Sequence, residues 1–186
     1  MPRTFLGWSV PADLREQAGR IAATLRAELP RAAWTRPETY HLTFAFLGDQ
    51  DDEALARLGS ALVSSIRSLP SARSSVGDAG FFPSARRARV GWLGLIDHES
   101  VENIAQVIRA VLATEGISFD DKPFHPHLTI VRPKTRWSQG DVERFIEAWK
   151  TLRGHPLLVD SVTLFESRQG AGGAIHVPRV VAKCAE

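Results

Sequence analysis

The chain has 186 residues, of which 44% are hydrophobic and 24% charged, and its formal net charge is +2. This composition is typical of a globular protein and excludes a disordered or low-complexity chain. The length suits one compact unit better than two independent cores, so we expect a single domain over residues 1–186.

Four segments repeat apolar residues with the period of a one-sided surface helix. Pro11 opens the first, and the third begins near Asp97 or Ser100. Ser138, with Asp141 three residues later, resembles a capping box at the start of the fourth. The periodic residues are, in chain order, Leu14, Ile21, Leu25 and Leu29; Leu55, Leu58, Leu62, Ile66 and Leu69; Ile104, Ile108, Val111 and Leu112; and Val142, Phe145, Ile146 and Trp149.

Apolar segments rich in β-forming residues lie between these helices. The predicted strands cover residues 4–10, 41–47, 76–82, 89–95, 127–131, 157–165 and 174–181. Each half of the chain then runs β, α, β, α, β, and one extra strand closes the second half. This order predicts an internally duplicated α+β fold in which each half forms a lobe. Periodicity leaves open whether the sheets are antiparallel or mixed, although short polar links favour hairpins.

The middle strand of each half carries the pattern His-x-Thr. The first copy is His41 and Thr43, and the second, 86 residues later, is His127 and Thr129. Because successive side chains of a strand point to opposite faces, each histidine shares a face with its threonine, while the intervening leucine faces a core. Two imidazoles with an ordinary pKa near ~6.5 suit a general acid and a general base at neutral pH.

The other histidines and the single cysteine are weaker candidates for chemistry. His125 and His127 form a His-x-His pair, but no third ligand of suitable spacing is visible, so we expect no metal site. Of the remaining histidines, His176 alone is placed where it could line a cleft. Cys184 is the only cysteine, so the chain cannot form an intrachain disulfide. The glycines at 170–173 lead into a strand, which predicts a hairpin turn and not a phosphate loop.

The basic residues are almost all arginines, which suit bidentate contacts with phosphate. Two clusters stand out, Arg86, Arg87 and Arg89, and then Arg132, Lys134 and Arg136. A net charge of +2 does not establish nucleic-acid binding, and a solvated surface is the simplest interpretation of both clusters. Arg132 is the exception, because it follows the second His-x-Thr closely enough to reach a bound phosphate. The N-terminus lacks the apolar stretch of a signal peptide or membrane span, so we expect a cytoplasmic protein.

The ordered motifs resemble the 2H phosphoesterases, and within them the RNA 2′,3′-cyclic phosphodiesterases, also called 2′-5′ RNA ligases. The resemblance runs nearly from end to end. One departure is His176, where the family often has a tyrosine. The matching segments are residues 3–6 (RTFL), 34–48 (WTRPETYHLTFAFLG), 80–83 (GFFP), 89–92 (RVGW), 122–130 (KPFHPHLTI) and 164–168 (LFESR).

The resemblance implies two pseudo-symmetric lobes with helices on their outer faces and an active-site cleft between them. It implies that His41 protonates the leaving ribose oxygen, that His127 activates water, and that Thr43 and Thr129 bind the phosphate oxygens. Arg132 would join them, but strict alternation places it on the face opposite His127, so this role requires a bulge or the strand's end. No cofactor or metal is implied.

The expected reaction is hydrolysis of an RNA terminal 2′,3′-cyclic phosphate to a 2′-phosphate. The expected partners are RNA ends or oligonucleotides that carry such a phosphate; we expect no membrane or obligate protein partner, and a monomer. Two alternatives remain open at this point. The same acid and base could cleave or join 2′-5′ phosphodiester linkages in RNA, or the chain could be a noncatalytic RNA-binding module that uses its basic residues and tryptophans.

Overall fold

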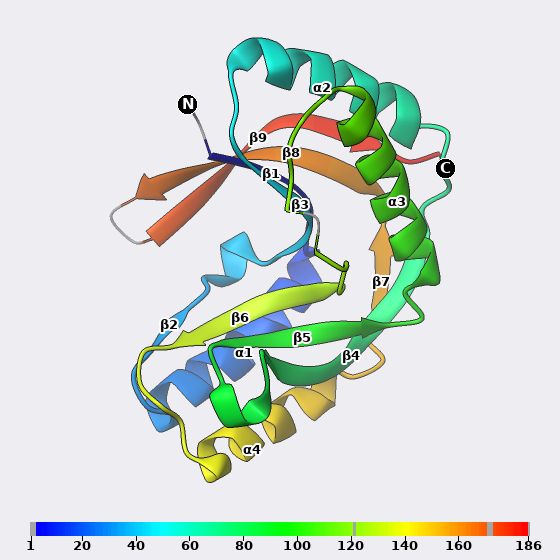
Figure 1. Ribbon diagram of the computed structural model, residues 1–186. Helices are drawn as coiled ribbons and strands as arrows, with labels where there is room; N and C mark the ends of the chain where they lie inside the picture. The colour runs from blue at the N-terminus through cyan, green and yellow to red at the C-terminus, as the bar shows by residue number, and fades with distance from the viewer. Residues whose placement is uncertain (1–2, 121, 171–172, 186) are drawn as a thin grey trace.

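The computed structural model describes residues 3–120, 122–170 and 173–185. Within them, nine strands form one curled sheet in the order β7-β4-β5-β6-β3-β1-β8-β9, with β2 paired to β6, and every pair of strands is antiparallel (Figure 1). The strands are β1 (Arg3–Ser9), β2 (Ala32–Trp34), β3 (His41–Asp49), β4 (Ala72–Phe82), β5 (Val90–Ile96), β6 (His127–Pro133), β7 (Pro156–Val159), β8 (Ser161–Gly170) and β9 (Gly173–Lys183). The helices are α1 (Ala12–Glu28), α2 (Asp52–Ile66), α3 (Glu99–Thr114) and α4 (Gln139–Ala148), with 3-10 turns η1 (Pro37–Thr39), η2 (Ala85–Arg87) and η3 (Trp149–Leu152).

The sheet is narrowest between β3 and β6, whose recorded register is a single pair, Leu42 opposite Leu128. On one side of this junction lie β1, β8 and β9 with α2 and α3, which we call the β3 lobe. On the other side lie β2, β4, β5 and β7 with α1 and α4, which we call the β6 lobe (Figure 1). Each lobe therefore contributes one His-x-Thr strand, and the predicted α+β fold with two lobes is confirmed.

The prediction that each half of the chain forms one lobe is wrong. Helix α1 comes from the first half of the chain but packs with α4 and η3 in the β6 lobe, whereas α3 comes from the second half and packs with α2 in the β3 lobe. The amphipathic pattern of a helix shows which face is buried but not which sheet covers it. The chain consequently crosses between the lobes several times.

The predicted strand over residues 157–165 is two strands that belong to different lobes. Strand β7 pairs with β4, and β8 pairs with β1 and β9. The change occurs at Asp160, where the buried positions shift from Leu157 and Val159 to Val162 and Leu164. Because burial in a strand has a period of two, this shift by one residue marks the break. Strand β2, which has three residues, was not predicted.

Local signals in the sequence explain where several helices begin. The hydroxyl of Ser138 accepts a hydrogen bond from the amide of Asp141, whose carboxylate accepts one from the amide of Ser138, so the predicted capping box is confirmed. The carboxylate of Asp51 caps α2 through the amide of Ala54 at 2.7 Å. In the described residues, no helix is long and apolar enough to cross a membrane.

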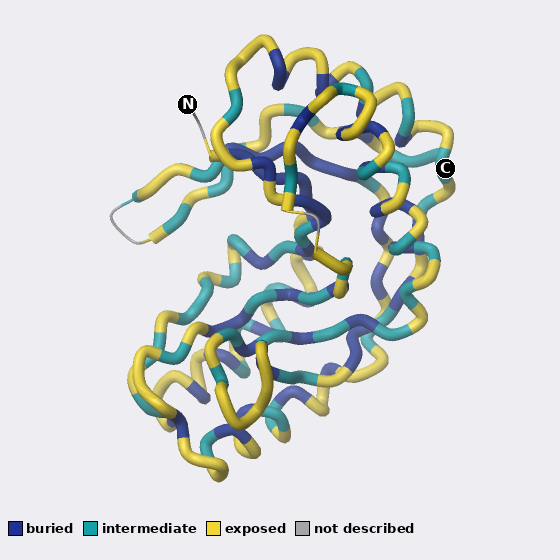
Figure 2. Tube along the Cα trace, viewed as in Figure 1, coloured by how far each residue is buried: buried dark blue, intermediate teal, exposed yellow. Residues whose placement is uncertain are grey.

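Buried residues follow the sheet and the helix faces turned toward it, whereas the outer end of the β8–β9 hairpin is exposed (Figure 2). The glycines at 170 and 173 pair across this hairpin, as predicted; residues 171 and 172 lie outside the described residues. In the β6 lobe the core is strongly aromatic: Phe145 contacts Phe81, Trp137 and Trp149 with ring centroids 4.9 to 6.0 Å apart. This packing fixes the end of β6 that leads to α4.

Candidate active site

The two His-x-Thr strands meet at one cavity of about 800 Å³ between the lobes. Leu42 and Leu128, which form the pair between β3 and β6, have exposures of 0% and 2%. The neighbouring histidines and threonines point the other way, and all four line the cavity, as alternation in the sequence predicts. His41, Thr43, His127, Thr129 and Arg132, the residues predicted from the sequence, therefore line the same cavity.

Both histidines are anchored by the same local contact. The Nδ1 atom of His41 lies 2.7 Å from the carbonyl oxygen of Thr39, and the Nδ1 atom of His127 lies 2.6 Å from that of His125. A carbonyl oxygen only accepts hydrogen bonds, so Nδ1 must carry the proton in each ring. This tautomer leaves Nε2 as the nitrogen that can take up or release a proton, and the repeated anchor makes the two sites equivalent by local geometry.

Burial favours the neutral form of both imidazoles. It lowers the pKa of His41 to about 4, and the hydrogen bond with the Thr39 carbonyl opposes this shift only partly. The pKa of His127 is also lowered, mainly by burial, with smaller contributions from the charges of His125 and Arg132. Each ring is consequently ready to accept a proton at neutral pH, and a bound anion would favour the protonated form.

Aromatic rings hold the histidines on both sides of the cavity. The Phe5 and His176 rings lie 4.8 and 4.9 Å from the His41 ring, and the Phe82 ring lies 4.9 Å from the His127 ring. His176 lines the cavity, where the sequence allowed it to be. The sequence analysis did not single out Phe5 and Phe82 individually, although both lie in segments that carry the family resemblance.

A bulge in β6 places Arg132 on the cavity side. Thr129 and Val131 pair with consecutive residues of β5, so Ile130 is an extra residue between them. Both Ile130 and Val131 are buried, and the alternation therefore shifts by one position. Arg132 lines the cavity with His127, and the bulge that its expected position required is present.

The same bulge occurs in β3. Thr43 and Ala45 pair with consecutive residues of β1, and Phe44 is the extra residue. The shift brings Phe46 to the cavity, where its side chain is 56% exposed. Phe46 therefore occupies the position in β3 that Arg132 occupies in β6. Sequence reasoning missed Phe46, but the alignment of the two His-x-Thr segments, HLTFAF and HLTIVR, shows the correspondence.

The described contacts of the His-x-His pair are to backbone and aromatic groups. His125 supplies its carbonyl oxygen to His127, and its ring lies 6.5 Å from that of Phe82. Within the described ranges, no three His, Cys, Asp or Glu side chains are grouped so that they could hold a metal ion.

Comparisons with known proteins agree with this architecture. A family model described as LigT-like phosphoesterase matches residues 9–92 and 95–176. The RNA 2′,3′-cyclic phosphodiesterase of Thermotoga maritima is 33% identical over 132 residues, which cover 71% of this chain and 70% of that protein. The protein of the same name from Escherichia coli is 32% identical over 166 residues, covering 82% and 89%.

The fold is also that of a solved relative. The crystal structure of Escherichia coli LigT complexed with 3′-AMP superimposes with a TM-score of 0.75, covering 100% of this chain and 99% of that one at 23% identity. Because the family model spans most of the chain and relatives above 30% identity match over most of its length, the family prediction is confirmed. This chain belongs to the LigT-like family of 2H phosphoesterases.

Proposed function

We propose that this protein hydrolyses the terminal 2′,3′-cyclic phosphate of RNA to a 2′-phosphate, with His41 as the general acid and His127 as the general base. The single observation that carries the proposal is the pair of equivalently anchored imidazoles that line one cavity. The names of the Thermotoga and Escherichia relatives support the choice of substrate.

In the proposed reaction, Nε2 of His127 removes a proton from water as the water oxygen attacks phosphorus. The bond between phosphorus and the 3′ oxygen breaks, and protonated His41 gives its Nε2 proton to that oxygen. Thr43 and Thr129 donate hydrogen bonds to the two non-bridging oxygens as negative charge develops. His127 is then protonated and His41 neutral, and exchange with solvent restores the starting state. Imidazoles and hydroxyls supply each of these functions, so we propose that no metal ion takes part.

The two roles are nearly interchangeable by local geometry, and the family resemblance assigns His41 as the acid. Arg132 adds a physical argument in the same direction. Its positive charge on the strand of His127 favours neutral imidazole there, which is the form that a general base needs. The corresponding position in β3 holds Phe46, which has no charge, although the charges of His176 and His127 also lower the pKa of His41. For His41 to act as the acid, the anionic phosphodiester must raise its pKa on binding.

Alanine substitution of each histidine tests the proposal. With an RNA oligonucleotide ending in a 2′,3′-cyclic phosphate, we expect His41→Ala and His127→Ala each to lower kcat by about 10²- to 10⁴-fold, which is about 3 to 5 kcal/mol in the barrier. The double variant should be scarcely slower than the single ones, because the two groups act in one step. A matched control is His98→Ala, since His98 contacts Glu102 at the start of α3 and does not line the cavity.

The outcomes separate the possible reactions. Near-normal turnover by either alanine variant would contradict the two-histidine mechanism, and loss of activity in excess chelator would contradict the metal-free one. Product analysis on cyclic-phosphate and 2′-5′-linked oligonucleotides distinguishes the proposed hydrolysis from chemistry on 2′-5′ linkages. Salt-sensitive RNA binding without turnover of either substrate would identify a noncatalytic binding module.

A further inference from the structure

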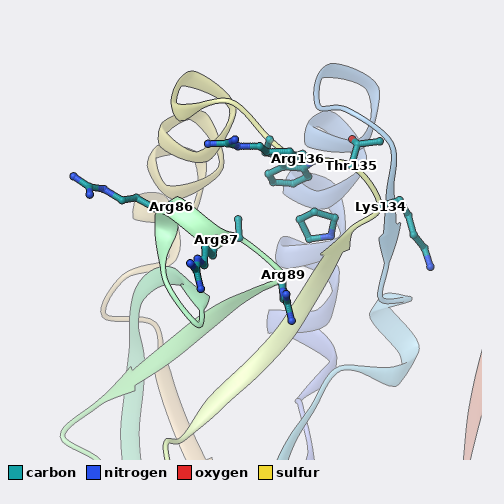
Figure 3. Close-up of a pocket in the computed structure, with 9 residues that line it drawn as sticks. Arg86, Arg87, Arg89, Lys134, Thr135 and Arg136 are labelled. Carbon is teal, nitrogen blue, oxygen red and sulfur yellow. The ribbon is translucent and has the colours of Figure 1, made fainter.

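The two basic clusters of the sequence meet in one hollow at the end of the β6 lobe. Arg86, Arg87 and Arg89 lie in and after η2, while Lys134 and Arg136 follow β6. Both segments line a cavity of about 630 Å³, together with Pro133 and Trp137 (Figure 3). Arg86 and Lys134 extend outward at its two ends, and Arg87, Arg89 and Arg136 lie between them (Figure 3). Residues more than forty positions apart thus build one surface, which we call the basic hollow.

Among the described residues, no carboxylate neutralises the charge of the basic hollow. No carboxylate lines the cavity, and its arginines and lysine form no ion pair in the part of the chain that the structure describes. The cationic groups must therefore be solvated or meet an external anion. Elsewhere, several surface arginines do have carboxylate partners. These are Arg20, Arg57, Arg153, Arg168 and Arg179.

Neighbouring residues of two strands line the basic hollow and the active-site cavity. Along β6, Arg132 lines the active-site cavity and the next residue, Pro133, lines the basic hollow. At the start of β5, Arg89 lines the basic hollow and the next residue, Val90, lines the active-site cavity. The two cavities share no lining residue, but they approach each other at this end of β5 and β6, where a polymer leaving the active-site cavity would reach the cations of the basic hollow.

The floor of the basic hollow is rigid. Trp137 is 5% exposed, and its ring contacts Phe81 and Phe145 in the core of the β6 lobe. It also contacts Trp34, which lines the active-site cavity, at 6.4 Å. Shared aromatic packing thus connects the floor of the basic hollow to the wall of the active-site cavity.

The opposite rim of the active-site cavity, on the side of β8 and β9, has fewer unpaired cations. There, Glu166 accepts hydrogen bonds from Arg168 at 2.7 Å and from Arg179 at 2.9 Å. Arg36, which lines the cavity, donates to the carbonyl oxygen of Ala174 at 2.8 Å. These guanidinium groups are engaged within the protein, whereas Arg3, which also lines the active-site cavity on β1, has no ion pair among the described residues. The basic hollow gathers five unpaired cations, so the stronger electrostatic attraction for a long polyanion is on its side.

From these observations we infer that the basic hollow binds the phosphate backbone of the single RNA strand that runs 5′ from the reacting phosphate. The inference rests on the proposed function: a terminal cyclic phosphate is the 3′ end of its chain, so only one strand leaves the active site. Arginine forks and a lysine suit successive phosphates, and they carry no base preference. The preferred substrate is accordingly an oligonucleotide with several nucleotides before its cyclic end, which binds more tightly than a free cyclic mononucleotide that only the active-site cavity can hold.

The test measures RNA binding and turnover separately in one charge-removal variant, Arg87→Gln/Arg136→Gln, which takes one cation from each segment. A matched control is Arg26→Gln/Arg67→Gln, which removes two exposed arginines from helix α1 and the end of α2. Binding is followed by fluorescence anisotropy of a labelled ten-nucleotide RNA ending in a 2′-phosphate, from 0.05 to 0.5 M salt. Turnover is measured with a 2′,3′-cyclic mononucleotide.

For single strands, log K falls with log salt by about 0.7 per phosphate neutralised, so loss of two contacts should make the slope shallower by about 1.4. If the affinities converge at 1 M salt, that slope difference weakens binding about 25-fold at 0.1 M. We expect this loss in the test variant alone, with kcat/KM on the mononucleotide within about twofold of wild type.

Three results would each overturn the inference. They are an unchanged salt slope in the test variant, an equal loss of RNA affinity in the control variant, and an equal loss of kcat/KM on the mononucleotide in the test variant. Displacement of the RNA by a ten-residue polyglutamate at the same concentration would do so too, because any flexible polyanion would then suffice. The binding experiment needs no turnover. If wild type binds the RNA through the basic hollow but hydrolyses no cyclic phosphate, the proposed function fails and the inference about the backbone stands.

Discussion

The pH dependence of kcat/KM should reveal how strongly burial acts on the two imidazoles. In the proposed mechanism activity requires protonated His41 and neutral His127, and kcat/KM reports the ionisation of the free protein. The rate should fall at acid pH as His127 gains a proton and at alkaline pH as His41 loses one. Because burial lowers the pKa of both groups, we expect both limbs of the bell-shaped profile to lie below pH 6.5.

The size of the effect follows from the pKa of His41, which is about 4. At pH 7 a group with that pKa is protonated in about one molecule in a thousand, whereas at the ordinary value of ~6.5 it would be protonated in about one in four. Above both pKa values kcat/KM should therefore fall about tenfold for each pH unit, and this decline should already be established at pH 6.5. The bound phosphodiester anion favours imidazolium, so the alkaline limb of kcat should lie at higher pH than that of kcat/KM.

The assay is steady-state hydrolysis of a cyclic-phosphate oligonucleotide from pH 4 to 9 at constant ionic strength. Near-ultraviolet circular dichroism at each pH verifies that the fold is intact. A value of kcat/KM that stays constant between pH 6.5 and 8 would refute the reasoning, because it would require at least one imidazole to titrate above this range. Identical alkaline limbs for kcat and kcat/KM would contradict the proposed effect of the bound anion.

Two further predictions concern the phosphate contacts and the fold. Thr43→Val and Thr129→Val should each lower kcat about 10²-fold, because each removes a hydroxyl donor while keeping the side-chain shape; a Val variant with wild-type kcat would show that its hydroxyl does not contact the phosphate. Ser138→Ala removes the capping box of α4 and should lower the free energy of unfolding by about 1 kcal/mol in urea denaturation, with kcat unchanged. An unchanged urea midpoint would show that the cap contributes nothing.

The central part of the site was predictable because it depends on local periodicity. Alternation alone places His41 with Thr43 and His127 with Thr129 on the face opposite the buried leucines. Arg132 was the difficult case, because the same alternation excludes it unless the strand contains a bulge. Register is a property of two paired strands, so the extra residue at Ile130 appears only when β6 is seen beside β5.

Features that depend on contacts between segments far apart in the chain could not be predicted from the sequence. The period of residues 12–28 predicts a helix but cannot show that it packs with α4 on the lobe of the second His-x-Thr strand. The clusters at 86–89 and 134–136 each have the composition of solvated surface, and their union in one cavity depends on the pairing of β5 with β6. The break at Asp160 could have been found, because the alternation of apolar residues changes phase there, from Leu157 and Val159 to Val162 and Leu164.

The two bulges explain how a nearly symmetric scaffold can favour chemistry in one direction. They give Phe46 and Arg132 equivalent positions beside the two histidines, while the backbone anchors of the imidazoles stay the same. These two side chains, which line one cavity, are one difference in charge between the two histidine sites; His176 beside His41 and His125 beside His127 are others. A cation beside His127 favours its neutral form and attracts the phosphate, whereas an exposed aromatic ring beside His41 offers an uncharged surface. Because Pro133, the residue after Arg132, lines the basic hollow, Arg132 lies near the point where the proposed RNA strand would leave the site.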